Sequence, residues 1–284
     1  MSELMRKNVS APEAEPTFWR LGLLGGERAI FSLSPAMHRR ALTASNLQGD
    51  YSALNVRSED LAETVKTLWE QGFGGLNVTA PHKLDVIGLC VGLAEEAREI
   101  GSVNTLIRRK DGFFGETTDA RGFVAAYGDA FDGRPSSRTL LLGAGGAARA
   151  AVAALKRLAV APRVAARNAD AAGRLARDFG LEVAAWPLAS EEAPFDVVVN
   201  AASASSAAQF DPPPGSIKLN KGGLVIDLNY GREDNMFEAL ARRAGATFFD
   251  GLPMLAQQAR LSFRLWTGRD PGSQVFQDAL LGQP

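Results

Sequence analysis

A glycine-rich turn near the middle of the chain most constrains its fold. Thr139–Leu142 is a short apolar run with the length of a buried strand, and Gly143, Gly145 and Ala148 follow it with the spacing G-x-G-x-x-A. Residues 147–158 are rich in alanine and leucine and predict a helix. Small residues at such a strand-to-helix turn let a pyrophosphate approach the backbone, and the helix N-terminus favours an anion. A loop that merely needs positive φ is the simpler explanation, but the flanking strand and helix favour a dinucleotide site.

The segments around this turn predict an α/β fold with a doubly wound sheet. Strands and helices alternate beyond the turn, and the first hundred residues alternate as well, which predicts a second, largely parallel sheet. The expected strands are 19–24, 51–56, 74–78, a hairpin of 103–108 and 113–114 through Asp111-Gly112, Thr139–Leu142, 163–166, 182–184, 196–200, 224–228 and 247–250. The expected helices are 34–46, 58–71 with Ser58 as N-cap, 84–97, 119–131, 147–158, Ala169–Phe179, 233–244 and 253–266. Residues 201–221, rich in Ser, Ala and Pro, predict a long loop.

Charge and cysteine content exclude several classes of function. The chain of 284 residues has 31 Lys and Arg against 32 Asp and Glu, without the basic footprint of a nucleic-acid or anionic-membrane protein. Its one cysteine, Cys90, excludes a disulfide framework, and His38 and His82 lack metal-ligand spacing. No apolar run approaches the roughly 20 residues of a membrane span, and the N-terminus lacks a secretory apolar core. We therefore expect a cytoplasmic protein whose residues 1–16 form a disordered tail.

Four further motifs occur in order along the chain. They are SLSP at 32–35, NVTAPHK at 77–83, GSVNTL at 101–106 and DGLPMLAQQA at 250–259. Together with the glycine turn they resemble the shikimate dehydrogenase family, from residue 19 to about 268. The resemblance implies a substrate-binding and catalytic α/β domain at 17–120 and 251–284, whose C-terminal helices return to it. It implies a Rossmann domain that binds NADP or NAD at 121–250, with the site in the cleft between the domains.

The resemblance also implies roles for particular residues. Lys83 would be the catalytic lysine and Asp119 its carboxylate partner. The residues that would bind the substrate are Ser32, Ser34, Thr79, Asn104, Tyr230 and Gln258. The residues that would meet the cofactor are Gly143, Ala144, Gly145, Gly146, Ala147, Arg167, Leu228 and Gly251. No metal site is implied, and the expected ligand is a small polyhydroxylated cyclic carboxylate bound by a monomer or homodimer.

Elementary chemistry agrees with these roles. Oxidation of a secondary alcohol by hydride transfer needs a group that takes the hydroxyl proton, and a Lys–Asp pair can both take it and orient the hydroxyl. Small hydroxyl and amide side chains suit a substrate with several hydroxyl groups. Taken singly, each residue has an ordinary explanation: Lys83 as a solvated helix start, Asp119 or Ser34 as a helix cap, Arg167 as a solvated strand-end cation. The interpretation therefore rests on the joint pattern.

Several positions depart from the family pattern. Arg28 and Phe31 stand before SLSP in place of the usual proline and histidine, and Thr117 replaces an asparagine. These changes leave the substrate open between shikimate and quinate or a modified relative, and leave open a non-catalytic, metabolite-sensing homologue. Arg167 after the second Rossmann strand favours NADP, whereas Asp170 nearby keeps NAD open.

Overall fold

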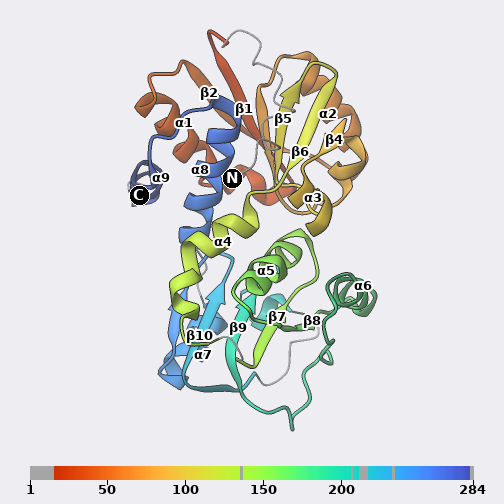
Figure 1. Ribbon diagram of the computed structural model, residues 1–284, viewed down its shortest axis with the longest axis vertical. Helices are drawn as coiled ribbons and strands as arrows, with labels where there is room; N and C mark the ends of the chain where they lie inside the picture. The colour runs from red at the N-terminus through yellow and green to blue at the C-terminus, as the bar shows by residue number, and fades with distance from the viewer. Residues whose placement is uncertain (1–15, 135–136, 206, 211–216, 232–233, 282–284) are drawn as a thin grey trace, which may run out of the picture.

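Two sheets with flanking helices make up the protein (Figure 1). The computed structural model describes residues 16–134, 137–205, 207–210, 217–231 and 234–281. The tail expected to be disordered lies, up to residue 15, outside these residues, as do parts of the expected loop at 201–221. None of the helices among the described residues is long and apolar enough to cross a membrane.

The first sheet has six strands in the order β2-β1-β3-β5-β6-β4. Its strands are β1 Trp19–Gly25, β2 Gly49–Asn55, β3 Gly75–Val78, β4 Gly92–Leu93, β5 Thr105–Arg109 and β6 Gly112–Glu116. The pairs β3/β5 and β5/β6 are antiparallel and the other three pairs are parallel. The sheet is therefore mixed rather than largely parallel, because the predicted hairpin of β5 and β6 lies within it.

The second sheet has five strands, all parallel, in the order β11-β10-β9-β7-β8. Its strands are β7 Thr139–Leu142, β8 Arg163–Ala165, β9 Phe195–Asn200, β10 Leu219–Asp227 and β11 Thr247–Phe249. Strands β7 and β9 are buried apolar runs, as expected where helices cover both faces of a parallel sheet. The strand expected at 182–184 is reduced to a single bridge between Val183 and Val164.

Nine α-helices occur among the described residues. They are α1 Ser34–Ala44, α2 Leu61–Glu70, α3 Glu95–Ile100, α4 Asp119–Tyr127, α5 Gly146–Arg157, α6 Ala169–Phe179, α7 Met236–Ala244, α8 Leu252–Thr267 and α9 Ser273–Leu281. Helix α8 runs alongside α4 between the two sheets, and α8 and α9 pack on α1 beside the first sheet (Figure 1). The expected α/β fold is confirmed, including C-terminal helices that return to the N-terminal part.

The helix predicted over 84–97 is wrong. The segment instead forms a 3-10 helix at Asp85–Leu89, then β4 at Gly92–Leu93 and α3 at Glu95–Ile100. The backbone N–H groups of Val91 and Ala94 donate to the carbonyl oxygens of Phe113 and Gly115, both at 2.9 Å. Two glycines, Gly88 and Gly92, disfavour a continuous helix, and hydrogen bonding to β6 satisfies the backbone that they interrupt.

Helix starts also differ from the expected ones. Ser58 does not cap a helix with its side chain; it opens a 3-10 turn, Ser58–Asp60, that leads into α2. Helix α7 begins at Met236, where the side chain of Asn235 accepts hydrogen bonds from the N–H groups of Phe237 and Glu238. An asparagine N-cap of this kind satisfies first-turn donors that otherwise lack partners, and it explains the later start.

Candidate active site

A cleft of about 1150 Å³ is lined on one side by residues of the first sheet, such as Asn77 and Val78, and on the other by residues that follow strands of the second sheet, such as Ala201 and Leu228. It gathers most of the predicted site residues: Ser32, Ser34, Thr79, Lys83, Asn104, Asp119, Gly145, Gly146, Ala147, Leu228, Tyr230, Gly251 and Gln258. Gly143, Ala144 and Arg167 are not among the residues that line it. Among the departures from the family pattern, Arg28 and Phe31 line the cleft, whereas Thr117 is fully buried outside it.

Lys83 and Asp119 form a nearly buried ion pair in this cleft. Lys83 lies in the turn after β3, and Asp119 is the first residue of α4. The Nζ atom of Lys83 donates to Oδ2 of Asp119 at 2.6 Å, and the two side chains are only 14% and 4% exposed. Each charge compensates the other where water is scarce, so removal of either would leave an unpaired charge in a buried place.

The amide of Asn104 fixes the other oxygen of the aspartate. Its Nδ2 atom donates to Oδ1 of Asp119 at 2.8 Å, while its Oδ1 atom accepts from the backbone N–H of Thr118 at 2.8 Å. The hydroxyl of Thr105 also donates to Oδ1 of Asn104 at 2.8 Å. Because donors meet the amide oxygen, the NH₂ group must face Asp119. Gln258 of α8 lies within 3.3 Å of the same NH₂ group.

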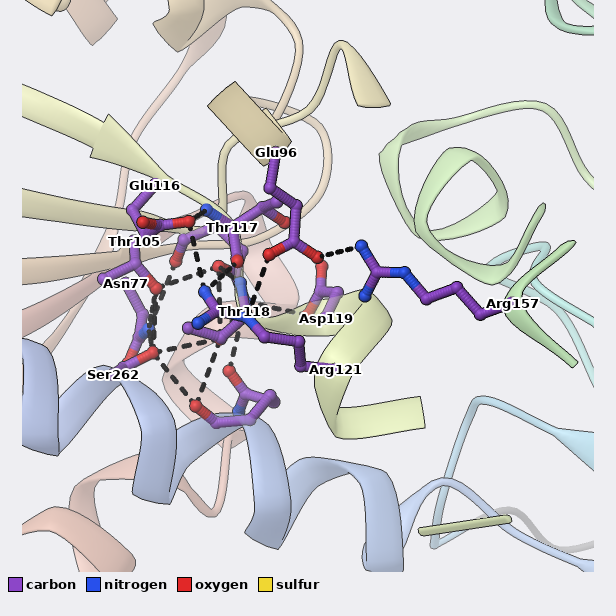
Figure 2. Close-up of polar contacts among 12 residues, drawn as sticks. Asn77, Glu96, Thr105, Glu116, Thr117, Thr118, Asp119, Arg121, Arg157 and Ser262 are labelled. Carbon is purple, nitrogen blue, oxygen red and sulfur yellow. Dashed lines mark hydrogen bonds and ion pairs between the residues drawn. The ribbon is translucent and has the colours of Figure 1, made fainter. Parts of the chain in front are cut away.

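A deeper polar layer, which includes Asn77, Thr105 and Ser262 (Figure 2), supports Asn104. Asn77 donates to the Asn104 carbonyl at 3.2 Å and to the Ser262 hydroxyl at 3.0 Å. The hydroxyl of Tyr51 donates to Oδ1 of Asn77 at 2.8 Å. Burial raises the pKa of Tyr51 well above its usual value of 10, so this hydroxyl stays protonated and remains a donor. The layer joins β2, β3 and α8 behind the ion pair.

Sequence reasoning did not identify this supporting layer. Asn77 and Thr105 lie inside the motifs NVTAPHK and GSVNTL, so their positions beside predicted site residues were a usable signal. Ser262 carries no such signal, because it lies 185 residues from Asn77 along the chain. Only the packing of α8 against α4 and the first sheet brings Ser262 to this place.

Two serines with adjacent hydroxyl groups occupy the wall formed by the start of α1. Ser32 donates from Oγ to Oγ of Ser34 at 3.1 Å, and the N–H of Ser34 donates to Oγ of Ser32 at 3.2 Å. Both residues line the cleft, as does Tyr230 from the opposite wall after β10. Hydroxyl donors that converge in this way can bind a carboxylate.

The glycine turn has the form that a dinucleotide needs. Gly143 adopts a φ of +107°, and a β-carbon there would lie 2.9 Å from the backbone of Ala201 and Ala202. Gly145 precedes α5, and no side chain caps the first turn of that helix. A β-carbon at Gly145 would have no atom within 4 Å. The uncapped N–H groups of α5 thus open on free space in the cleft wall, where they can hold phosphate oxygens.

Arg167 lies outside the residues that line the cleft, whereas both histidines pack in the interior. Arg167 follows β8 and is exposed, and no ion pair forms at it among the described residues. Both histidines are fully buried: His38 stacks on Tyr51 with ring centroids 4.4 Å apart, and His82 contacts the carbonyl of Val56 at 2.8 Å. Across the described part of the chain, no cluster of His, Cys, Asp and Glu could hold a metal ion.

Comparisons with known proteins match this arrangement. A family model described as the shikimate dehydrogenase substrate binding domain matches residues 24–106, and one for the shikimate 5'-dehydrogenase C-terminal domain matches residues 251–281. A shikimate dehydrogenase (NADP(+)) from an Anaeromyxobacter species is 40% identical over 87% of this chain and 90% of its own length. The Thermus thermophilus shikimate 5-dehydrogenase, solved in complex with NADP(H) and shikimate, has a TM-score of 0.78 at 34% identity, covering 92% of this chain and 98% of its own. The Aquifex aeolicus shikimate dehydrogenase has a TM-score of 0.83 at 28% identity, covering 95% and 99%.

Proposed function

Because the chain belongs to the shikimate dehydrogenase family, we propose that it oxidises shikimate reversibly with NADP as the hydride acceptor. The observation that carries the proposal is the ion pair of Lys83 and Asp119, 2.6 Å apart in the cleft that the glycine turn also lines. Family membership alone gives a reaction class. The nearly buried acid and base beside the glycine turn indicate where that reaction would take place in this chain.

In the proposed reaction, Lys83 transfers the proton and Asp119 orients the reacting hydroxyl. The chemistry that a bound cofactor would supply is hydride transfer, to NADP+ in oxidation and from NADPH in reduction. In the reductive direction the ammonium group of Lys83 would donate a proton to the oxygen on which negative charge develops, and in oxidation the neutral amine of Lys83 would take the hydroxyl proton. Asp119 compensates the ammonium charge and holds the hydroxyl through a charge-assisted hydrogen bond.

Polar side chains on the cleft walls would position the substrate. We assign its carboxylate to the adjacent hydroxyl groups of Ser32 and Ser34, with Tyr230 nearby, and its ring hydroxyls to Thr79, Asn104 and Gln258. The rigid setting of Asn104, held from both sides of its amide, supports its part in this assignment. A pocket built to hydrogen-bond hydroxyl groups discriminates strongly against analogues that lack them, because the unused polar groups would be left unpaired.

For the cofactor we assign the diphosphate to the glycine turn and the 2′-phosphate to Arg167. The uncapped start of α5 supports the first assignment. Arg167 supports the second because it is exposed directly after β8, where a cation accommodates the extra phosphate of NADP. The relatives named NADP(+) enzymes agree with this preference.

The two sheets suggest how the chain divides. We propose a substrate-binding and catalytic domain at 17–120 and 251–284 and a dinucleotide-binding domain at 121–250. The six-stranded sheet falls in the first and the five-stranded sheet in the second, and α8 and α9 pack on α1 of the first.

The proposal is tested by initial-rate reduction of NADP and NAD with shikimate and with quinate, followed at the nicotinamide absorbance. We expect the fastest reduction with NADP and shikimate. Quinate as the better substrate would mean that Phe31 in the cleft and the other changes have altered specificity. Protein that binds NADP but reduces it with neither compound would support the sensing homologue instead.

A further inference from the structure

Arg28 is a cation on the cleft wall without an acidic partner. It lies in the 3-10 turn Glu27–Phe31, which follows β1 of the first sheet, and its side chain lines the cleft. No carboxylate among the described residues forms an ion pair with it. Because no carboxylate in the described part of the chain neutralises its guanidinium, Arg28 can bind an anionic ligand in the cleft.

The side chain of Arg28 reaches across the cleft and forms one hydrogen bond on the other side. Its Nη1 atom donates to the carbonyl oxygen of Ser203 at 2.9 Å. Ser203 follows β9 of the second sheet, so the contact joins the two walls. The preceding residues, Ala201 and Ala202, are the ones whose backbone packs against Gly143 of the glycine turn. The guanidinium of Arg28 is therefore held near the carboxyl ends of β7 and β9.

That place is where a parallel sheet binds a dinucleotide. In the second sheet β7 pairs with β8 on one side and with β9 on the other, so the strand order reverses between β7 and β9. Ligands of such sheets bind in the crevice outside the carboxyl ends of the strands at this reversal. The uncapped N-terminus of α5 opens on the same crevice from the β7 side. Arg28 faces it from the wall of the first sheet.

We propose that Arg28 is a cofactor ligand supplied from the opposite wall, and that it binds the diphosphate of the dinucleotide. The inference rests on the proposed function, since it takes NADP as the cofactor. A guanidinium has five N–H donors in a planar fork that matches phosphate oxygens, and the carbonyl of Ser203 uses one of them. Arg28 would then contact the cofactor while it joins the two walls of the cleft.

The test is the affinity of the free protein for NADPH and NADH, measured by nicotinamide fluorescence without substrate. Arg28→Gln should raise both dissociation constants by the same factor, about tenfold, because the diphosphate is common to both cofactors. Arg28→Lys should keep part of the affinity, since it keeps the charge but loses the fork. The slope of log Kd against log salt concentration should become shallower in Arg28→Gln.

Arg20→Gln is the matched control. Arg20 is also exposed and also donates to one backbone carbonyl, that of Gln71 at 2.7 Å, but it does not line the cleft. It should leave both dissociation constants unchanged. Arg28→Gln with unchanged Kd values would overturn the proposal, and so would a rise only in the KM for shikimate, which would place the substrate carboxylate at Arg28. Wild-type protein that binds neither dinucleotide would overturn the proposed function together with this inference.

Discussion

Gly146 packs directly against Lys83: a β-carbon added at Gly146 would lie 2.7 Å from Cβ of Lys83 and 2.7 Å from Oγ of Ser102. The first residue of α5 therefore touches the side chain to which we assign proton transfer. Neither atom can make room by a side-chain rotation alone, because Ser102 is fully buried and Cβ of Lys83 is bonded to the backbone. A methyl group at residue 146 would therefore push α5 and the turn that holds Lys83 apart. The glycine at this position thus serves the packing of the two walls as well as the turn.

Gly146→Ala should lower kcat by about 10²-fold, because a displacement of roughly 1 Å in a catalytic group costs that much. The added methyl group should also lower the free energy of unfolding by about 1–3 kcal/mol through overpacking. Gly145→Ala is the control for stability, since a β-carbon there meets no atom within 4 Å and its φ is −87°. Equal melting temperatures for Gly146→Ala and wild type would contradict the steric account.

Lys83→Met should abolish most turnover while the chain still folds. Loss of a positioned acid and base costs typically about 10²–10⁴-fold in rate. The variant also leaves the carboxylate of Asp119 nearly buried without its partner, so urea unfolding should show a loss of about 3–5 kcal/mol. Lys66→Met on α2, whose side chain is 76% exposed, is the matched control and should keep wild-type rates. Near wild-type turnover in Lys83→Met would remove Lys83 from the reaction.

Local patterns were enough to predict most of the fold. The β7–turn–α5 unit and α6 follow from apolar runs and helical spacing that need no distant partner. The helix predicted over 84–97 was wrong because the apolar residues of this segment have helical spacing, whereas the backbone of Val91 and Ala94 hydrogen-bonds to the edge of β6. Edge pairing of this kind depends on a strand that comes later in the chain, and local spacing does not contain it.

Some residues of the candidate site could be predicted from local motifs, and others could not. Lys83 and Asn104 lie in the motifs NVTAPHK and GSVNTL, and both meet Asp119 in the cleft. Ser262 and Tyr51 belong to the same hydrogen-bonded layer through Asn77, although they are far from it in sequence. Ser262 reaches this layer through the packing of α8, and Tyr51 through the place of β2 in the first sheet; both depend on the whole fold.

Arg167→Ala should raise the KM for NADP far more than the KM for NAD. The side chain is exposed after β8, and only NADP carries the 2′-phosphate that a cation there would hold. Initial rates with both cofactors at saturating shikimate measure the difference. This selective effect differs from that of Arg28→Gln, which should weaken the binding of both cofactors equally. The same increase for NADP and NAD would refute the assignment of Arg167.

Cys90 should be unreactive in the folded chain. Burial raises the pKa of its thiol to about 11, so almost none is present as thiolate at pH 8. The thiol also donates to the carbonyl of Val86 at 3.3 Å. Because Cys90 is the only cysteine in the sequence, reaction with a disulfide reagent such as DTNB reports on it alone. We expect rapid reaction in denaturant and slow reaction in buffer; equal rates would show that the segment 86–90 opens freely.

His38→Phe should make the protein less sensitive to acid. Burial lowers the pKa of His38 from 6.5 to about 3, so between these values the unfolded chain binds a proton that the folded chain does not. Folding stability is therefore lost as pH falls from 6.5 towards 3, by about 1.4 kcal/mol per pH unit and up to about 5 kcal/mol in all. Phenylalanine keeps the stacking on Tyr51 but cannot bind the proton. Urea unfolding at pH 7.5, 5.5 and 4.5 should show a gap between variant and wild type that widens as pH falls, whereas parallel losses would mean that carboxylates alone cause the acid sensitivity.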